Sequence, residues 1–331
     1  MDVAHLRLLR ELHDRGSVAA VAAAQHVSAS AVSQQLAVLQ ARVPVPLTVR
    51  RGRALALTPA GEALAAAGTR VDEALVAARE AVGAFLDATD RPVRVSAFHS
   101  AALALFGPLL RELDGTPPLH LADADVAHRD FPGLTADHDI VVAHRLAHDE
   151  PWPAERVATV PLLEEPLDIA LAADHPLARR VELRAVDLVD ERWVSVHAGF
   201  PLAGVLDHLA AHVGRPLDVA HRINEFSVTA EVVRAGAAIA VMPRTTTTPL
   251  AVDGLVLRPL ADLPLVRHVD ALARPDALAY EAVRRVLSAL RAVSARAPER
   301  PGSTGSERGA ASSSFIAFSS PLNRRADFPT L

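Results

Sequence analysis

Cysteine is absent from the 331 residues of this chain, which excludes disulfide bonds and thiolate metal sites. Lysine is absent as well, so arginine supplies all 34 basic side chains. No apolar stretch approaches the roughly 20 residues that a membrane helix needs. Asp2, Arg7, Arg10 and Glu11 interrupt the apolar run that a signal peptide would require. The sequence therefore predicts a soluble, cytoplasmic protein with no membrane partner.

The motifs of common enzyme classes are missing too. There is no Gly-Lys-Ser/Thr phosphate loop and no Gly-x-Ser-x-Gly elbow. His144 and His148 have the i,i+4 spacing of a metal-binding pair and Glu150 follows, but Pro151 interrupts the segment. We therefore expect no catalytic residue, no metal site and no cofactor.

Half of the residues are hydrophobic, which is enough for two or three domains with cores of their own. Residues 1–58 contain short helical patterns that end in an arginine-rich turn, and residues 59–89 form one long helical pattern. Residues 92–297 alternate strand-like and helix-like runs. Residues 298–331 are rich in Ser, Pro, Gly and Arg without a sustained period, which predicts a disordered tail.

The net charge of −5 is unevenly distributed along the chain. Residues 1–60 contain seven arginines and three acidic residues, a balance of +4, so the remainder carries −9. A basic head on an acidic body suits a protein that contacts phosphates at one end only. Ordinary scatter in surface charge is the alternative.

The N-terminal segment predicts a helix-turn-helix. A first helix over 3–15 ends at Gly16, and Ser17 is placed to cap an alanine-rich helix over 18–25. After a short turn, Ser28 is placed to cap a third helix that runs to about Val43. Two short helices joined by a turn of three or four residues are typical of the motif.

The third helix has two distinct faces. Its apolar residues fall in one narrow stripe that must pack inward, namely Val32, Leu36, Leu39 and Val43. Small and amide side chains occupy the opposite face, namely Ser30, Ser33, Gln34 and Ala37. Such a face suits the major groove of DNA, where the Gln34 amide has the donor and acceptor for a bidentate contact with adenine. A solvated polar face is the alternative.

Residues 48–57 predict two short strands around a glycine-containing turn. Arg50, Arg51 and Arg53 lie at the tip. A β-wing with three guanidinium groups beside a recognition helix favours contacts to phosphates and the minor groove. A solvated hairpin tip is the alternative.

Thr58 and Pro59 then begin the long helix, as N-cap and first helical residue. Apolar or small residues recur along it at alternating spacings of four and three, namely Leu64, Gly68, Val71, Leu75, Ala78, Val82 and Phe85. This seam predicts a dimer helix that holds two DNA-binding modules at a fixed spacing. Packing of the seam on its own domain is the alternative.

Several motifs of this segment resemble the head of the LysR family of transcriptional regulators, in order and spacing. They are Met1-Asp2 through Leu6-Arg7, Gly16-Ser17, His26-Val27-Ser28, Ser30-Ala31-Val32-Ser33-Gln34-Gln35-Leu36, Val45-Pro46-Leu47 and Leu57-Thr58-Pro59-Ala60-Gly61. Two departures concern the exit from the third helix, which contains Pro44, and Ala29, which replaces the family's usual glutamine or proline. The resemblance implies that Ser28, Ala29, Ser30, Ser33, Gln34, Arg50, Arg51 and Arg53 contact double-stranded promoter DNA.

The body predicts two α/β lobes joined by crossing strands, as in periplasmic binding proteins, behind the all-α winged helix-turn-helix domain. We expect strands over 92–98, 119–124, 139–143, 167–172, 193–196, 217–223, 238–241, 254–259 and 266–273, and helices over 100–113, 202–213, 227–235 and 275–293. The resemblance continues here, in Glu164-Glu165-Pro166-Leu167, Asp174-His175-Pro176-Leu177-Ala178, Asp187-Leu188, Arg192-Trp193 and the run from Ala235 to Arg244.

The resemblance implies that a small effector, often a carboxylate, binds between the two lobes of each chain. It also implies that the chain forms a homodimer or a homotetramer. The residues that it assigns to the effector are His99, Ser100, Ser195, His197, Phe226 and Thr229. A helix N-terminus at His99-Ser100 favours an anion, although Ser100 could simply cap its helix. A ligand-binding transport component and an enzyme with a DNA-binding appendage are the rival functions.

Overall fold

The computed structural model describes residues 1–51, 54–83, 91–247 and 254–296. The predicted tail over 298–331, Arg53 and Phe85 lie outside the described residues. No helix within the described ranges is both long and apolar enough to cross a membrane.

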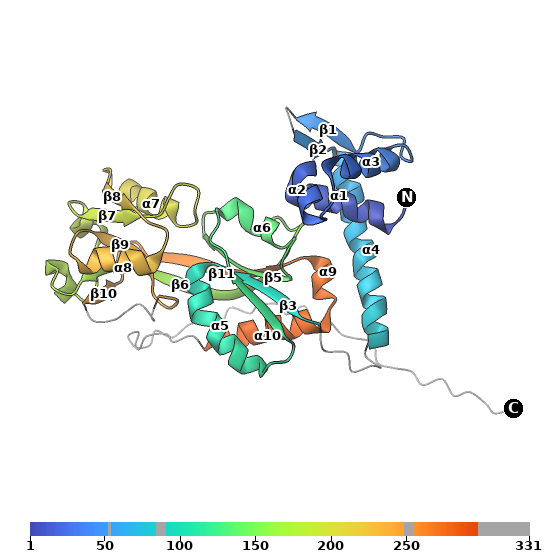
Figure 1. Ribbon diagram of the computed structural model, residues 1–331. Coiled ribbons are helices and arrows are strands. Elements are labelled where there is room, and N and C mark those ends of the chain that lie inside the picture. Colours follow the sequence, from blue (N-terminus) through green and yellow to red (C-terminus); the bar gives the residue numbers. More distant parts are fainter. Residues whose placement is uncertain (52–53, 84–90, 248–253, 297–331) are drawn as a thin grey trace, which may run out of the picture. The chain divides into compact units, whose positions relative to one another are not determined.

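The head consists of α1 (Val3–Arg15), α2 (Val18–Ala24) and α3 (Ala29–Gln40), followed by the hairpin β1 (Thr48–Arg51) and β2 (Ala54–Leu57) (Figure 1). The predicted stops and caps are present. Gly16 ends α1 with φ of 71°, a conformation that glycine adopts without strain. The hydroxyls of Ser17 and Ser28 accept hydrogen bonds from the first turns of α2 and α3.

Helix α3 ends at Gln40 and not near Val43 as the sequence predicted, because the Gln40 side chain organises the exit. Its amide nitrogen donates to the carbonyl oxygens of Val43 and Val45 at 3.2 and 2.9 Å. Its amide oxygen accepts from the backbone nitrogen of Leu47 at 2.8 Å. These three bonds satisfy the backbone around Pro44, which has no N–H of its own.

Helix α4 (Pro59–Gly83) packs along α1. Gly61 permits the close approach at its start, because a Cβ there would lie 2.1 Å from the carbonyl oxygen of Leu47. Farther along α4, the buried carboxylate of Asp72 accepts hydrogen bonds from Arg7 Nε and Arg10 Nη1, each at 2.8 Å. Helix α4 is therefore fixed to α1 by both packing and charge.

One part of the predicted heptad seam packs against α1, and another part is exposed. Gly68 faces α1, where a Cβ would lie 3.0 Å from Leu6 Cβ. Val71, Leu75 and Val82 are 37, 36 and 62% exposed. Packing within the head therefore accounts for one part of the seam and leaves an apolar row on α4 uncovered.

The body is built on one nine-stranded sheet with the order β4-β3-β5-β11-β6-β9-β7-β8, and β10 pairs with β6. The strands are β3 (Val93–Ala97), β4 (Leu119–Asp123), β5 (Ile140–Leu146), β6 (Ala158–Ala172), β7 (Arg192–Ser195), β8 (Asp218–Arg222), β9 (Ile239–Pro243), β10 (Leu255–Arg258) and β11 (Leu265–Ala273). Strands β3, β4 and β5 run parallel in one lobe, and β7, β8 and β9 run parallel in the other. The long β6 and β11 pair antiparallel between them.

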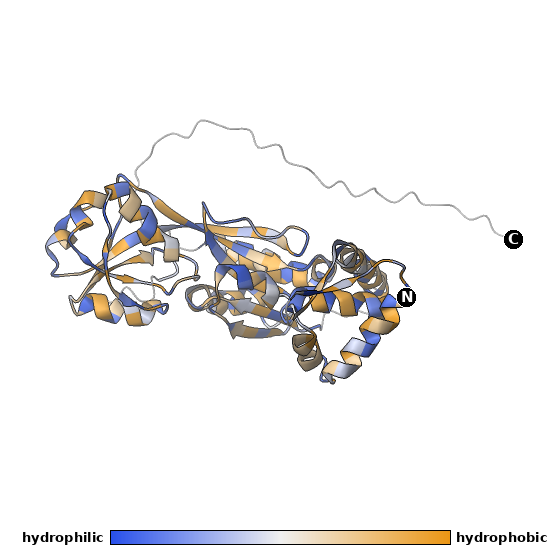
Figure 2. Cartoon of the chain, turned by 90° about the horizontal axis from the view of Figure 1, so that it is seen from above, coloured by the Kyte–Doolittle hydropathy of each residue, from blue (hydrophilic) through white to orange (hydrophobic). Residues whose placement is uncertain are grey.

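Each lobe has a hydrophobic core of its own. In the first lobe, α5 (His99–Leu113) and α10 (Glu281–Ala295) pack on the sheet with the short α6 (Phe131–Leu134) and α9 (Pro275–Leu278) nearby. In the second lobe, α7 (Ala203–Val213) and α8 (Phe226–Arg234) cover the strands, with the 3₁₀ turns η2 (Pro176–Arg179) and η3 (Ala185–Leu188) in the connections. The 3₁₀ turn η1 (His128–Asp130) lies between β4 and α6 in the first lobe. Hydrophobic residues follow the strands and one side of these helices (Figure 2).

The predicted fold class is therefore confirmed, with two corrections. The final helix predicted over 275–293 is two helices, α9 and α10, because Tyr280 adopts an extended conformation with ψ of 130°. The crossing strand predicted to begin at Leu167 begins at Ala158, and its first half alternates between half-buried and exposed residues.

Candidate functional site

The exposed face of α3 carries the side chains that the sequence assigned to DNA. Ser28, Ser30, Ser33 and Gln34 are all exposed. The Ser28 hydroxyl lies 2.9 Å from that of Ser30, and the Ser33 hydroxyl donates to the carbonyl oxygen of Ala29 at 2.9 Å. The Gln34 amide has no hydrogen-bond partner within the described chain, so both its donor and its acceptor are available to a base edge.

The wing follows α3 closely. Arg50 is exposed on β1, opposite Leu55, and Arg51 pairs with Ala54 at the end of the hairpin. Because Arg50 is exposed on the strand that leads to the tip, the hairpin presents positive charge beside the exposed face of a short helix.

A small cavity lies between the lobes of the body. The first lobe, the second lobe and β11 all contribute to its walls. The residues that line it are Phe98, His99, Ser100, Asp125, His144, Val196, Phe200, Pro201, Leu202, Asn224, Glu225, Phe226 and Arg267. Three of the six residues assigned to the effector, His99, Ser100 and Phe226, are among them.

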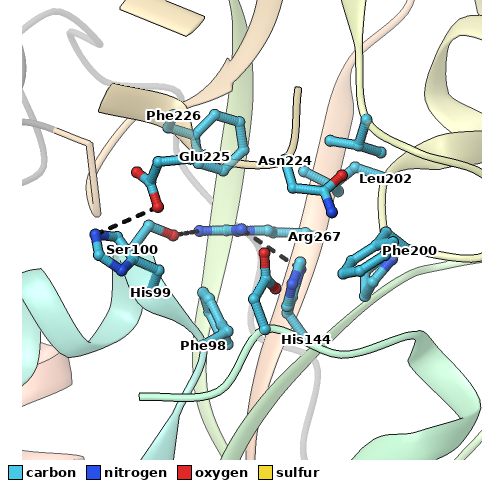
Figure 3. Close-up of a pocket in the computed structure, with 13 residues that line it drawn as sticks. Phe98, His99, Ser100, His144, Phe200, Leu202, Asn224, Glu225, Phe226 and Arg267 are labelled. Atoms are coloured by element: carbon cyan, nitrogen blue, oxygen red, sulfur yellow. Dashed lines mark hydrogen bonds and ion pairs between the residues drawn. The ribbon is translucent and has the colours of Figure 1, made fainter. Parts of the chain in front are cut away.

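The N-terminus of α5 opens into this cavity. Phe98 is the N-cap and supplies no side-chain acceptor to the first turn. The Ser100 hydroxyl does not cap the helix, since it accepts from Arg267 Nη2 at 3.1 Å (Figure 3). The backbone N–H groups of this first turn therefore keep their capacity to bind an anion.

A fully buried ion pair lies beneath the cavity, between Arg267 on β11 and Glu165 on β6. Arg267 Nε donates to Glu165 Oε2 at 2.8 Å, and Nη2 donates to Thr246 Oγ1 at 2.6 Å. The Glu165 carboxylate also accepts from the backbone nitrogens of Thr245 and Thr246. The crossing strands, α5 and the segment after β9 therefore meet in one hydrogen-bond network.

His144 completes the network in the neutral form. Burial of the imidazole, and secondarily the positive charge of Arg267, lowers the pKa of His144 well below its usual value. Its Nδ1 lies 3.4 Å from Arg267 Nη1, and its ring centroid lies 4.1 Å from that of Phe98. Because Arg267 can only donate, His144 Nδ1 is the acceptor of that contact.

Carboxylates dominate the mouth of the cavity. Glu225 Oε1 caps α8 by accepting from the backbone nitrogen of Ser227 at 3.0 Å, and Glu225 Oε2 lies 3.4 Å from His99 Nε2 (Figure 3). Asp125, which follows β4 in the first lobe, also lines the cavity. Partial burial, and secondarily the negative charge of Glu225, raises the pKa of Asp125.

The remaining residues assigned to the effector lie elsewhere in the second lobe. Ser195 and Thr229 are buried and line a neighbouring small cavity, which shares Val196, Leu202 and Phe226 with the first. His197 is exposed and belongs to neither lining. Its backbone nitrogen donates to Asn224 Oδ1 at 2.9 Å, which orders the loop at the cavity wall.

Sequence reasoning missed the buried network and the acidic mouth. Arg267 lies in the strand predicted over 266–273, and a charge within that pattern was the signal that could have identified it. Glu165 lies just before the strand predicted over 167–172, so it carried no such signal. Asp125 follows β4, and Glu225 precedes α8. The order of strands in the sheet brings these two loops together, and the sequence alone does not show that order.

No metal site emerges from the described residues, where no group of three or more His, Asp or Glu side chains is arranged to hold an ion. His144 belongs to the Arg267 network, whereas His148 stacks against His208 with ring centroids 5.8 Å apart. Their sequence spacing therefore does not bring the two rings to one ligand.

Two protein families match the chain. The family described as bacterial regulatory helix-turn-helix protein, lysR family, matches residues 3–62, and the LysR substrate binding domain matches residues 87–295. The small neutral protease regulatory protein of Streptomyces coelicolor is 31% identical over 320 residues, which cover 90% of this chain and 98% of that protein. The regulator MetR of Salmonella typhimurium is 27% identical over 194 residues, 58% of this chain, and the match spans only 59% of MetR.

Solved structures share the fold. A variant of full-length OxyR from Pseudomonas aeruginosa superposes with a TM-score of 0.64 at 22% identity, covering 91% of this chain and 99% of that one. The regulatory domain of CcmR from Synechocystis, in complex with 2-PG, has a TM-score of 0.53 at 17% identity and covers 63% of this chain and 99% of that one. With a helix-turn-helix head, a two-lobed body and family matches over both, the chain belongs to the LysR family.

Proposed function

We propose that this protein is a transcriptional regulator whose binding to double-stranded promoter DNA is modulated by a small effector bound between its lobes. The observation that carries the proposal is the combination, in one chain, of an exposed polar face on α3 beside a basic wing and a cavity walled by both lobes of the body. The protein acts in the cytoplasm as a regulator and not as an enzyme.

The chain divides into three functional segments. Residues 1–58 bind DNA, residues 59–89 pair two copies, and residues 92–297 bind the effector. The exposed row of Val71, Leu75 and Val82 supports pairing along α4, because burial of apolar side chains against a second copy stabilises a dimer. The assembly is a homodimer or a pair of such dimers.

The effector carries an anionic group that binds at the N-terminus of α5. The uncapped first turn supplies backbone N–H groups, and the helix dipole adds positive potential there. Arg267 contributes little to this anion site, because Glu165 already neutralises its charge.

Coupling between effector and DNA follows from the position of the cavity. A ligand that contacts both lobes favours one relative arrangement of the lobes over others. If that arrangement also changes the affinity for DNA, DNA changes the affinity for the effector by the same factor.

The proposal is tested with the purified chain and the DNA upstream of its own gene, at two salt concentrations and with random-sequence DNA as competitor. Arg50→Ala should weaken binding and reduce the slope of log affinity against log salt by about one unit, because one phosphate contact is lost. Arg215→Ala, an exposed arginine in the second lobe, is the matched control. Equal affinity and equal slope for Arg50→Ala and the unaltered chain contradict the assignment of the wing.

A further inference from the structure

The described residues that line the cavity supply no free positive charge to match its negative charges. Arg267 is the one arginine in the lining, and all three of its nitrogens have partners inside the protein: Glu165, Thr246, Ser100 and His144. His99 is the other basic group at the mouth, and it lies 3.4 Å from both Asp123 and Glu225. A simple anion would therefore find the backbone of α5 and no spare cation.

Two carboxylates line the cavity from opposite lobes. Asp125 follows β4 in the first lobe, and Glu225 precedes α8 in the second. Within the described residues, Asp125 has no hydrogen-bond or ion-pair partner, and Glu225 forms its ion pair with His99. Burial, and secondarily the negative charge of Glu225, raises the pKa of Asp125, whereas the charges of Arg267 and His99 act in the opposite direction. No side chain in the described part of the chain forms an ion pair with both carboxylates.

We propose that the effector is a small zwitterion, in which a protonated amine lies between Asp125 and Glu225 while its anionic group binds the first turn of α5. This inference rests on the proposed function of the cavity and specifies the ligand that it selects. The carbon skeleton of the ligand packs against Phe200, Leu202 and Phe226, which line the second-lobe wall.

The same arrangement gives the amine a role in lobe closure. Because Asp125 and Glu225 belong to different lobes, an ammonium group between them attracts both and stabilises the closed arrangement. An anion without an amine leaves the two carboxylates to repel each other and adds a third negative charge beside Glu225. The ligand class that closes the lobes is therefore narrower than that of acids in general.

The experiment compares three matched panels of probes on the full-length chain by thermal shift and isothermal calorimetry. The panels are the proteinogenic L-α-amino acids, the corresponding 2-oxo acids and the corresponding amines without a carboxylate. We expect at least one amino acid to bind, with its 2-oxo acid and its amine each at least about tenfold weaker, as expected when a charged group loses its hydrogen-bonded partner.

Two variants test the carboxylates. Glu225→Gln keeps an oxygen that can cap α8 but removes the charge, and Asp125→Asn removes the charge of the opposite wall. Each variant should bind the amino acid about tenfold or more weakly than the unaltered chain does. Its affinity for the corresponding 2-oxo acid should be unchanged or higher. Asp218→Asn, which removes an exposed carboxylate on β8, should change the affinity for neither ligand.

The outcomes separate this inference from the proposed function. If 2-oxo acids bind as tightly as amino acids, or if Glu225→Gln and Asp125→Asn leave the preference intact, the amine subsite is wrong and the anion site stands. If no probe of any panel binds while the chain still binds its promoter, both the zwitterion and the proposed anion site fail. If the unaltered chain binds the promoter no better than random-sequence DNA, the proposed regulator function fails, whatever the ligand panels show.

Discussion

Removing either charge of the Arg267–Glu165 ion pair should destabilise the body more than removing one charge of an exposed ion pair. Both side chains are fully buried, and the nearest nitrogen and oxygen lie 2.8 Å apart. With an effective dielectric constant of about 20, their attraction at that distance is about 6 kcal/mol. Desolvation of the two ions offsets part of this attraction, so Arg267→Met or Glu165→Gln should each cost about 3 to 5 kcal/mol.

The double variant distinguishes a charge pair from two independent contacts. Arg267→Met leaves a buried carboxylate without its counter-charge, and Glu165→Gln leaves a guanidinium that cannot lose its proton. In the double variant neither charge remains, so its cost should be smaller than the sum of the single costs by about 2 kcal/mol or more.

Urea denaturation followed by tryptophan fluorescence measures this directly. The chain has two tryptophans, and Trp152 and Trp193 lie in the hydrophobic cores of the first and second lobes, so the signal reports the body and not the head. Asp190→Asn, which breaks an exposed pair with Arg215, should cost less than about 1 kcal/mol. Additive costs for Arg267→Met and Glu165→Gln would refute the reasoning.

Two further changes test the head and the buried histidine. Gly61→Ala should destabilise the head by about 1 to 3 kcal/mol, seen by circular dichroism and as weaker DNA binding, because the new methyl group meets the backbone of Leu47. His144 resists protonation in the folded state, whereas the unfolded chain binds that proton below about pH 6.5. Stability should therefore fall by up to about 1.4 kcal/mol per pH unit as the pH drops below 6.5, and His144→Gln should lessen this slope in urea titrations at several pH values.

Matched controls accompany both changes. Gly107→Ala adds a methyl group to α5 where the nearest atom, on Arg111, is 3.7 Å away, so it should be neutral or stabilising. Equal stability of the Gly61→Ala and Gly107→Ala chains would contradict the close approach of α4. His120→Gln alters an exposed histidine and serves as the control for His144→Gln. If both variants change the slope of stability against pH equally, buried His144 is not the cause of that slope.

Local signals explain how much of the fold the sequence predicted. Gly16, Ser17, Ser28 and Thr58 act within a few residues of themselves, and the helices that they begin or end are where their chemistry requires. The end of α3 was misplaced because Gln40 bonds to residues that lie up to seven positions later, which periodicity does not encode.

The candidate site was only half predictable for the same reason. His99 and Ser100 could be found because a strand that runs into a helix marks an anion-binding terminus. The partner groups Glu165 and Arg267 are 102 positions apart, and only the pairing of β6 with β11 brings them together. Family resemblance assigned Ser195 and Thr229, yet the side chains line the neighbouring cavity in this chain.

The fixation of α4 to α1 by Asp72 makes the helix a lever arm. Its 25 residues span about 37 Å at 1.5 Å per residue. Because Arg7 and Arg10 lock α1 to the same helix, the head turns with α4 and does not bend away from it. A tilt of about 5° at one end moves the other by about 3 Å, close to the axial rise of one base pair in DNA. Small rotations at the base of α4 would thus become whole steps along a promoter.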